Sequence, residues 1–223
     1  MHSPAVEHRA YLVPTGFLDA DHAAVVAFAT GAARSAADAI ERATALYYAV
    51  RDRIRYDAHD IDLRPEAMRA SSILARGAGF CVAKAVVLAA AARALEIPSR
   101  LGFADVRNHL ATESMRRAMG TDLFVFHGYA ELWLQGRWVK VTPAFNKALC
   151  ERFGVAPLEF NGRHDSLFQQ VDRDGKRYME YVCDRGQCAD LPLDRLRAAF
   201  EDHYPALVSD GVYAVDRREG SGS

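Results

Sequence analysis

The chain has 223 residues, of which 50% are hydrophobic and 26% are charged, and its formal net charge at pH 7 is −1. This length allows one large domain or two small ones. The balanced charge excludes a strong attraction to nucleic acid or to an acidic membrane surface. No apolar run reaches the roughly 20 residues that span a bilayer, and the N-terminal sequence lacks the basic and apolar regions of a signal peptide. We therefore expect a cytoplasmic protein without nucleic-acid or membrane partners.

The first half of the chain is predicted to be helical. Apolar residues at helical spacing indicate two helices within residues 20–55, the first capped by Asp21 and the second running from about 35 to 54. Residues 56–70 read as a loop, and a short helix is expected at 69–76. From Val82 to Leu95 nearly every residue is apolar, so this segment predicts a helix buried at the centre of the domain.

The second half is predicted to be mostly strands. Residues 99–106 form the first, and residues 107–122 are polar with some helical character. The segments 125–134 and 137–145 are separated by Gln135 and Gly136, which is the signature of a hairpin. A strand at 177–184 and a helix at 193–204 complete the pattern. Helices followed by strands favour an α+β fold with an antiparallel sheet.

We expect residues 1–218 to form a single domain, and the last five residues, EGSGS, to be a flexible tail or a cloning scar. The chain has four cysteines, which is too few for a disulfide scaffold, so we expect reduced thiols. Cys183 and Cys188 lack the spacing of a zinc site, and no second ligand pair accompanies them. The sequence predicts neither a metal nor another cofactor.

Cys81 falls at the predicted first turn of the central helix. The unpaired backbone N–H groups and the positive end of the helix dipole at such a position favour a thiolate. They can lower a cysteine pKa from about 8.5 to below neutrality. Gly77 and Gly79 would allow a tight turn that leaves the thiol accessible. The alternative is that Cys81 is a packing residue, because cysteine is among the most often buried residue types.

A nucleophilic cysteine needs a base, which is usually a histidine held by a third group. Among the eight histidines, His127 lies inside a predicted strand, and His109 in a polar loop is a weaker candidate. A two-residue turn at 135–136 would pair Tyr129 with Thr142 and His127 with Ala144. Thr142 would then be a diagonal neighbour of His127 on the same face of the hairpin.

The stretch GFCVAKAVVLAAAARALEIPSRL resembles the cysteine motif of the transglutaminase-like superfamily, which shares the papain-like fold. HGYAELWLQGRWVKVTP resembles its histidine-to-aspartate motif, and the recognisable part spans residues 51–146. The resemblance implies a small, single-domain member of bacterial type, with N-terminal helices and a central cysteine-bearing helix packed on an antiparallel sheet. Cys81 would be the nucleophile and His127 the base.

The third catalytic position departs from the family pattern, because Thr142 stands where an aspartate is normal. A threonine hydroxyl can accept a hydrogen bond from the imidazole, but it cannot stabilise an imidazolium by charge. Asn146 is a substitute orienter, since papain-like enzymes use an asparagine in this role. The alternatives are three carboxylates, Asp105, Asp122 and Asp165. Separately, Asn108 follows a predicted strand and is a candidate for substrate contact or oxyanion donation.

The resemblance implies a cysteine enzyme that attacks an amide or thioester carbonyl of a peptide or small acyl substrate. Hydrolysis through an acyl-enzyme is favoured over cross-linking, because the chain has no calcium-site pattern like that of the large transglutaminases. Two alternatives remain open. One is an inactive binding module on the same fold, and the other is an acyltransferase that acts on a small amine within a biosynthetic pathway.

Overall fold

A computed structural model of the chain describes residues 8–58, 60–109, 121–152, 154–167, 179–205, 208–209 and 212–214. The helical character expected within 107–122 falls mainly on 110–120, outside these ranges, as does the tail at 219–223. None of the described helices is both long and apolar enough to cross a membrane.

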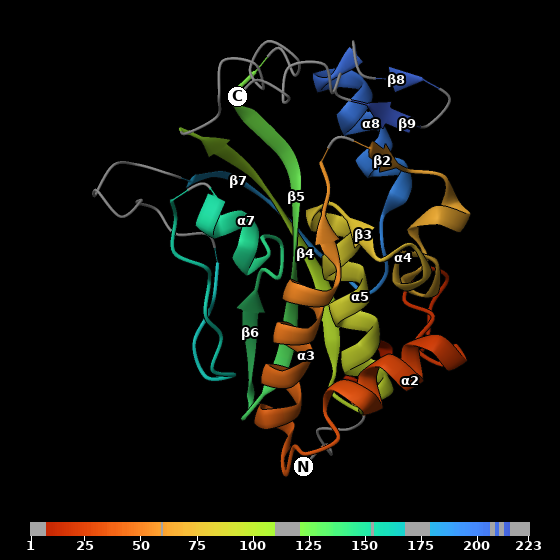
Figure 1. Cartoon of the computed structure of the whole chain (residues 1–223). Helices are drawn as coiled ribbons and strands as arrows, with labels where there is room; N and C mark the ends of the chain where they lie inside the picture. Colours follow the sequence, from red (N-terminus) through yellow and green to blue (C-terminus); the bar gives the residue numbers. More distant parts are fainter. Residues whose placement is uncertain are drawn as a thin grey trace.

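The fold centres on a four-stranded antiparallel sheet with the strand order β6-β5-β4-β7. Its strands are β4 (Ser99–Asn108), β5 (Leu123–Leu134), β6 (Arg137–Val141) and β7 (Met179–Cys188). The central helix α5 (Cys81–Ala94) packs against β5 and β4, and α2 (Ala23–Ala32), α3 (Ala39–Arg53) and α4 (Ala70–Arg76) pack around it (Figure 1). The predicted α+β class with an antiparallel sheet is confirmed.

Smaller elements complete the chain. The parallel strands β1 (Arg55–Tyr56) and β3 (Ala78–Gly79) pair next to the start of α5, and α8 (Leu193–His203) contacts β5. The others are η1 (Arg9–Tyr11), β2 (Asp60–Asp62), η2 (Pro65–Met68), α7 (Lys147–Arg152), β8 (Val208–Ser209) and β9 (Val212–Ala214).

Several predicted boundaries shift in the structure. The side chain of His22, not Asp21, caps α2 by accepting a hydrogen bond from the N–H of Ala24. The helix α3 begins at Ala39 rather than near residue 35, because Asp38 caps it through the N–H of Glu41 and Glu41 reaches back to the N–H of Ala37. The expected loop at 56–70 contains β2 and η2. The strand predicted at 177–184 is described from Met179 and continues to Cys188.

The central helix is buried along almost its whole length, as its composition predicts. Its two charged residues are buried too, and both bind backbone carbonyls. Lys84 Nζ donates to the carbonyls of Arg51 at 2.8 Å and Ile54 at 2.7 Å, which lie at the end of α3. Arg93 donates to the carbonyls of Val13, Ser99 and Ala189. These charges therefore fasten neighbouring segments to the core.

The hairpin of β5 and β6 has the predicted register. Trp133 pairs with Trp138, and both turn residues, Gln135 and Gly136, have positive φ angles of 50° and 80°. The ladder stops where Ala130 pairs with Val141, so the expected pairs of Tyr129 with Thr142 and of His127 with Ala144 do not form. Pro143 has no N–H to donate and favours an extended Thr142, whose N–H donates to the carbonyl of Ser166 instead.

Candidate active site

Cys81 is the first residue of α5 and follows a short glycine-rich connection. Gly77 ends α4 with a φ of 66°, a conformation that favours glycine. A Cβ on Gly79 would lie 2.7 Å from that of Ala83, so this position also requires a glycine for close packing. The two glycines thus allow the chain to pass from α4 directly into α5. Cys81 packs against two clusters of buried apolar residues, one that includes Val82 and Phe126 and one that includes Val106 and Met179.

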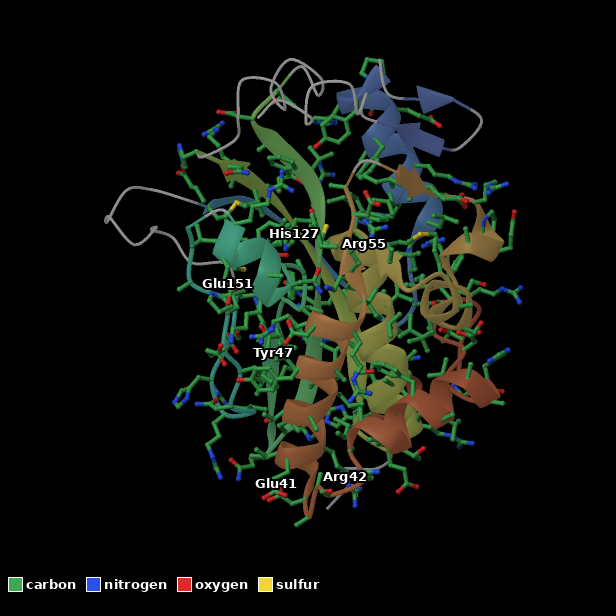
Figure 2. All side chains as sticks on the ribbon, viewed as in Figure 1. Glu41, Arg42, Tyr47, Arg55, His127 and Glu151 are labelled. Atoms are coloured by element: carbon green, nitrogen blue, oxygen red, sulfur yellow. The ribbon has the colours of Figure 1, made fainter. Side chains whose placement is uncertain are left out.

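The strand β5 passes the start of α5 in direct contact. A Cβ on Gly128 would lie 2.8 Å from Val82 Cα, so only glycine fits there without displacing the backbone. The backbone of Gly128 forms a hydrogen bond with the Cys81 thiol. Since Gly128 follows His127, the fold brings the two predicted catalytic segments together. Figure 2 shows His127 level with Arg55, just beyond the end of α3, and far from Glu41 and Arg42 at the start of that helix.

The surroundings of Cys81 and His127 favour their neutral forms. Burial raises the pKa of the Cys81 thiol to about 11, although hydrogen bonds with the backbone of Gly128, Val82 and Cys81 itself oppose this shift. Desolvation lowers the pKa of His127, which is 5% exposed, to about 3. The helix start acts in the predicted direction, but the expected pKa below neutrality is not found, because desolvation outweighs the backbone N–H groups.

Thr142 is 1% exposed, and its hydroxyl has no hydrogen-bond partner in the described part of the chain. Its backbone N–H donates to the carbonyl of Ser166. The residue therefore lies just past β6, as the sequence predicts, but in this structure it does not hold the imidazole of His127 by a hydrogen bond. A buried hydroxyl without a partner lowers the stability of a fold, and the Thr142 hydroxyl remains able to form a hydrogen bond.

Asn146 uses its amide to hold other segments. Its Oδ1 accepts a hydrogen bond from the N–H of Tyr56 at 2.6 Å, and its Nδ2 donates to the carbonyls of Ile54, at 2.9 Å, and Arg51. The last two are the same carbonyls that Lys84 binds. Within the described residues these contacts give Asn146 a structural part at the end of α3, and none of them involves His127.

The three alternative carboxylates have different partners. Asp165 is exposed and accepts a hydrogen bond from the N–H of Lys140, and Asp122 lies near Arg107. Asp105 is buried, and its Oδ1 accepts a hydrogen bond from the N–H of Phe126, the residue before His127. Asp105 also forms an ion pair with Arg185. Among the three, Asp105 therefore contacts the strand segment that carries the predicted base.

Asn108 is the last residue of β4. His127 pairs with Ala104 on β4, and Asn108 lies four residues further along that strand, which corresponds to about 13 Å at the usual strand rise. His109, the weaker candidate base, lies beside it and contacts Glu180 at 2.9 Å. Among the described residues, no group of histidine, cysteine, aspartate or glutamate side chains has the arrangement of a metal site.

Two residues near the candidate site are absent from the sequence-based set. Tyr204, at the end of α8, places its hydroxyl against the backbone of β5 two residues before His127, and Arg185 of β7 pairs with Asp105. Both lie far along the chain from the two motifs that carry Cys81 and His127. No local pattern marks them, because their role depends on an irregularity in β5 that only the folded sheet shows.

Comparison with known proteins agrees with this arrangement. Residues 26–143, more than half of the chain, match the transglutaminase-like superfamily. The fold is similar to a crystal structure from Cytophaga hutchinsonii that is described as a proposed cysteine protease, with a TM-score of 0.52 at 14% sequence identity. The match covers 84% of this chain and 50% of that one, so the chain spans about half the length of that protein. No curated protein matches the chain.

Proposed function

Because the chain belongs to the transglutaminase-like superfamily, we propose that it is a cysteine hydrolase that cleaves an amide or thioester bond through an acyl-enzyme at Cys81. The observation that carries this proposal is the contact between the start of α5 and Gly128, the residue that follows His127. This contact sets a thiol beside the strand that bears the imidazole. The substrate would be a peptide or a small amide or thioester.

The pKa directions imply a particular chemistry for the pair. The thiol and the imidazole are both neutral near pH 7, because burial disfavours either charge. His127 would therefore act as a general base that takes the thiol proton while the sulfur attacks the carbonyl carbon. Backbone N–H groups at the start of α5 would stabilise the resulting oxyanion.

Collapse of the tetrahedral intermediate completes the first half of the reaction. The leaving amine or thiol takes the proton from His127, and Cys81 keeps the acyl group as a thioester. Water then attacks this thioester, with His127 again as the base, and its proton returns to the Cys81 sulfur. The free acid leaves, and both side chains regain their neutral forms. No separate cofactor is needed for this chemistry.

The direct test is the formation of the acyl-enzyme with a model substrate. The protein is mixed with p-nitrophenyl acetate near pH 7, the released p-nitrophenolate is followed, and the acetylated residue is found by mass spectrometry. We expect an acetyl group on Cys81 and its loss in Cys81→Ala. The control is Cys183→Ala, which removes an exposed thiol and should change nothing. Acetylation that persists on other residues but spares Cys81 would refute the proposal.

A second candidate is a non-catalytic module that binds a peptide or small acyl ligand on the same fold. The threonine in place of the aspartate favours it, since the Thr142 hydroxyl is buried, has no hydrogen-bond partner among the described residues and carries no charge. Such a module would leave Cys81 unmodified by p-nitrophenyl acetate, and its ligand binding would survive Cys81→Ala. The third alternative, acyl transfer, differs only in the acceptor, so added small amines would appear in its products.

A further inference from the structure

The strand β5 contains a bulge directly before His127. The ladder between β4 and β5 pairs Ala104 with His127 and then Val106 with Phe124, so Asp105 alone lies opposite two residues, Val125 and Phe126. Phe126 has a φ of 57°, a left-handed conformation that a bulky side chain rarely adopts. An extra residue of this kind is the definition of a β-bulge, and bulges are frequent next to active sites.

Side chains from distant parts of the chain satisfy the backbone groups that the bulge releases. The N–H of Val125 donates to the Tyr204 hydroxyl at 2.7 Å, and the same hydroxyl donates to the carbonyl of Leu123 at 2.9 Å. The N–H of Phe126 donates to Asp105 Oδ1 at 3.0 Å. Two consecutive N–H groups of β5 are thus bound by side chains and not by the backbone of a neighbouring strand.

The carboxylate of Asp105 is itself held in place by Arg185. The guanidinium donates to both carboxylate oxygens, at 2.5 Å and 2.9 Å, and its carbon lies 5.1 Å from the centre of the Phe126 ring. The ladder between β4 and β7 is also irregular on either side of Asp105. Three neighbouring strands therefore depart from regular pairing at the same level. There Asp105 joins β4 to β7 through the ion pair with Arg185, and to β5 through the N–H of Phe126.

We propose that Tyr204 and the Asp105–Arg185 ion pair are positioning residues that fix the bulge in β5 and thereby the orientation of His127 toward Cys81. This inference rests on the proposed function, in which His127 is the base. Side chains alternate between the two faces of a strand, so one extra residue reverses which face every later residue presents. The bulge lies immediately before His127, and its geometry decides where the imidazole points.

The properties of Tyr204 suit this role. The residue is 4% exposed, and its ring packs against Phe200 of α8. Burial raises its pKa above the usual value, so the hydroxyl stays protonated and can both accept from Val125 and donate to Leu123. Arg185 and Tyr204 both lie beyond residue 143, where the family match ends. The last part of the chain would therefore help to shape the candidate site.

The test compares Tyr204→Phe with Tyr47→Phe. Both changes remove one buried hydroxyl that binds the backbone, but Tyr47 donates to the carbonyl of Leu158 and lies away from His127 (Figure 2). The first readout is the imidazole signals of His127 in ¹H–¹⁵N NMR spectra, assigned with His127→Gln. The second is the rate at which p-nitrophenyl acetate modifies Cys81.

We expect Tyr204→Phe to shift the His127 signals and to slow the modification of Cys81 about tenfold or more, because small misplacements of reacting groups are costly. Tyr47→Phe should lower the stability comparably and leave both readouts unchanged. Equal effects of the two variants on the His127 signals would overturn the inference. If Tyr204→Phe fails to fold, Asp105→Asn serves instead, since it keeps an acceptor for Phe126 but weakens the pairing with Arg185.

The two proposals can fail separately. If the wild-type protein does not react with p-nitrophenyl acetate at Cys81, the proposed function fails. The NMR comparison still decides whether Tyr204 and Asp105 fix the imidazole. His127 signals that move in Tyr204→Phe and Asp105→Asn but not in Tyr47→Phe would support the positioning role in an inactive protein as well.

Discussion

Replacing Gly128 by alanine tests the contact on which the candidate site depends. The new Cβ would lie 2.8 Å from Val82 Cα and 2.9 Å from Val82 Cγ2, whereas an ordinary contact begins at 3.4 Å. Val82 Cα belongs to the backbone, so a rotamer change in Val82 cannot relieve the clash. The strand and the helix must therefore separate by roughly half an ångström, and overpacking of this kind costs about 1–3 kcal/mol.

The same separation would move Gly128 and its neighbour His127 away from Cys81. Because a misplacement of about 1 Å can cost 10²-fold in rate, we expect Gly128→Ala to slow the acetylation of Cys81 about tenfold. Thermal unfolding measures the stability, with a shift of about 2–4 °C for each kcal/mol in a chain of this size. Acetylation by p-nitrophenyl acetate measures the site.

Gly31→Ala is the matched control. Gly31 is an exposed residue of α2, and a Cβ there meets nothing within 4 Å, so this change should stabilise the helix by up to about 1 kcal/mol and leave acetylation unchanged. If Gly128→Ala keeps both the wild-type melting temperature and the wild-type acetylation rate, the close approach of β5 to α5 is wrong.

Three further changes separate the roles of neighbouring residues. Asn146→Ala should lower the free energy of unfolding in urea by about 1–3 kcal/mol, because the hydrogen bonds of its side-chain amide at the end of α3 are lost, and it should have little effect on Cys81 acetylation. A large loss of acetylation rate without a loss of stability would instead show that Asn146 orients His127. Thr142→Asp restores a charge beside the site and should raise the pKa of His127 and speed acetylation about tenfold or more; an unchanged rate would show that position 142 does not act on His127. Burial lowers the pKa of Lys84 from 10.5 to about 7, so between these pH values Lys84 binds more protons in the unfolded chain than in the folded one. The free energy of unfolding of the wild type, relative to that of Lys84→Met, should therefore rise with pH across this range. A difference between the two proteins that does not change with pH would contradict this expectation.

Much of the fold could be predicted from the sequence because its signals are local. The apolar run after Cys81 indicates a buried helix, and Gln135 and Gly136 supply the positive φ angles that a two-residue hairpin turn requires. The register of β5 and β6 follows from that turn. The prediction went too far past Val141, since Pro143 ends the ladder and the chain pairs with Ser166, a contact that depends on a segment distant in sequence.

The candidate site also has parts that local sequence motifs predict and parts that they do not. Cys81 and His127 are marked by motifs, and the contact with Gly128 brings their segments together. The pKa of the thiol could not be predicted, because it depends on how completely the folded protein excludes water from the helix start. The proposed roles of Asp105 and Tyr204 depend on the bulge in β5. This bulge arises from the pairing of three strands, so no local sequence pattern predicts it.

The central claim, that His127 takes the proton of Cys81 during attack on a carbonyl, is tested most directly by the pH dependence of Cys81 acetylation in wild type and His127→Ala. Because burial raises the pKa of the Cys81 thiol and lowers that of His127, both groups are neutral across the neutral range, and the proton can move only as the sulfur attacks the carbonyl. We expect wild-type acetylation near pH 7 to exceed that of the variant about 100-fold or more. Equal rates in both proteins, rising only as the thiol ionises at high pH, would contradict the claim and leave Cys81 an ordinary, unreactive cysteine.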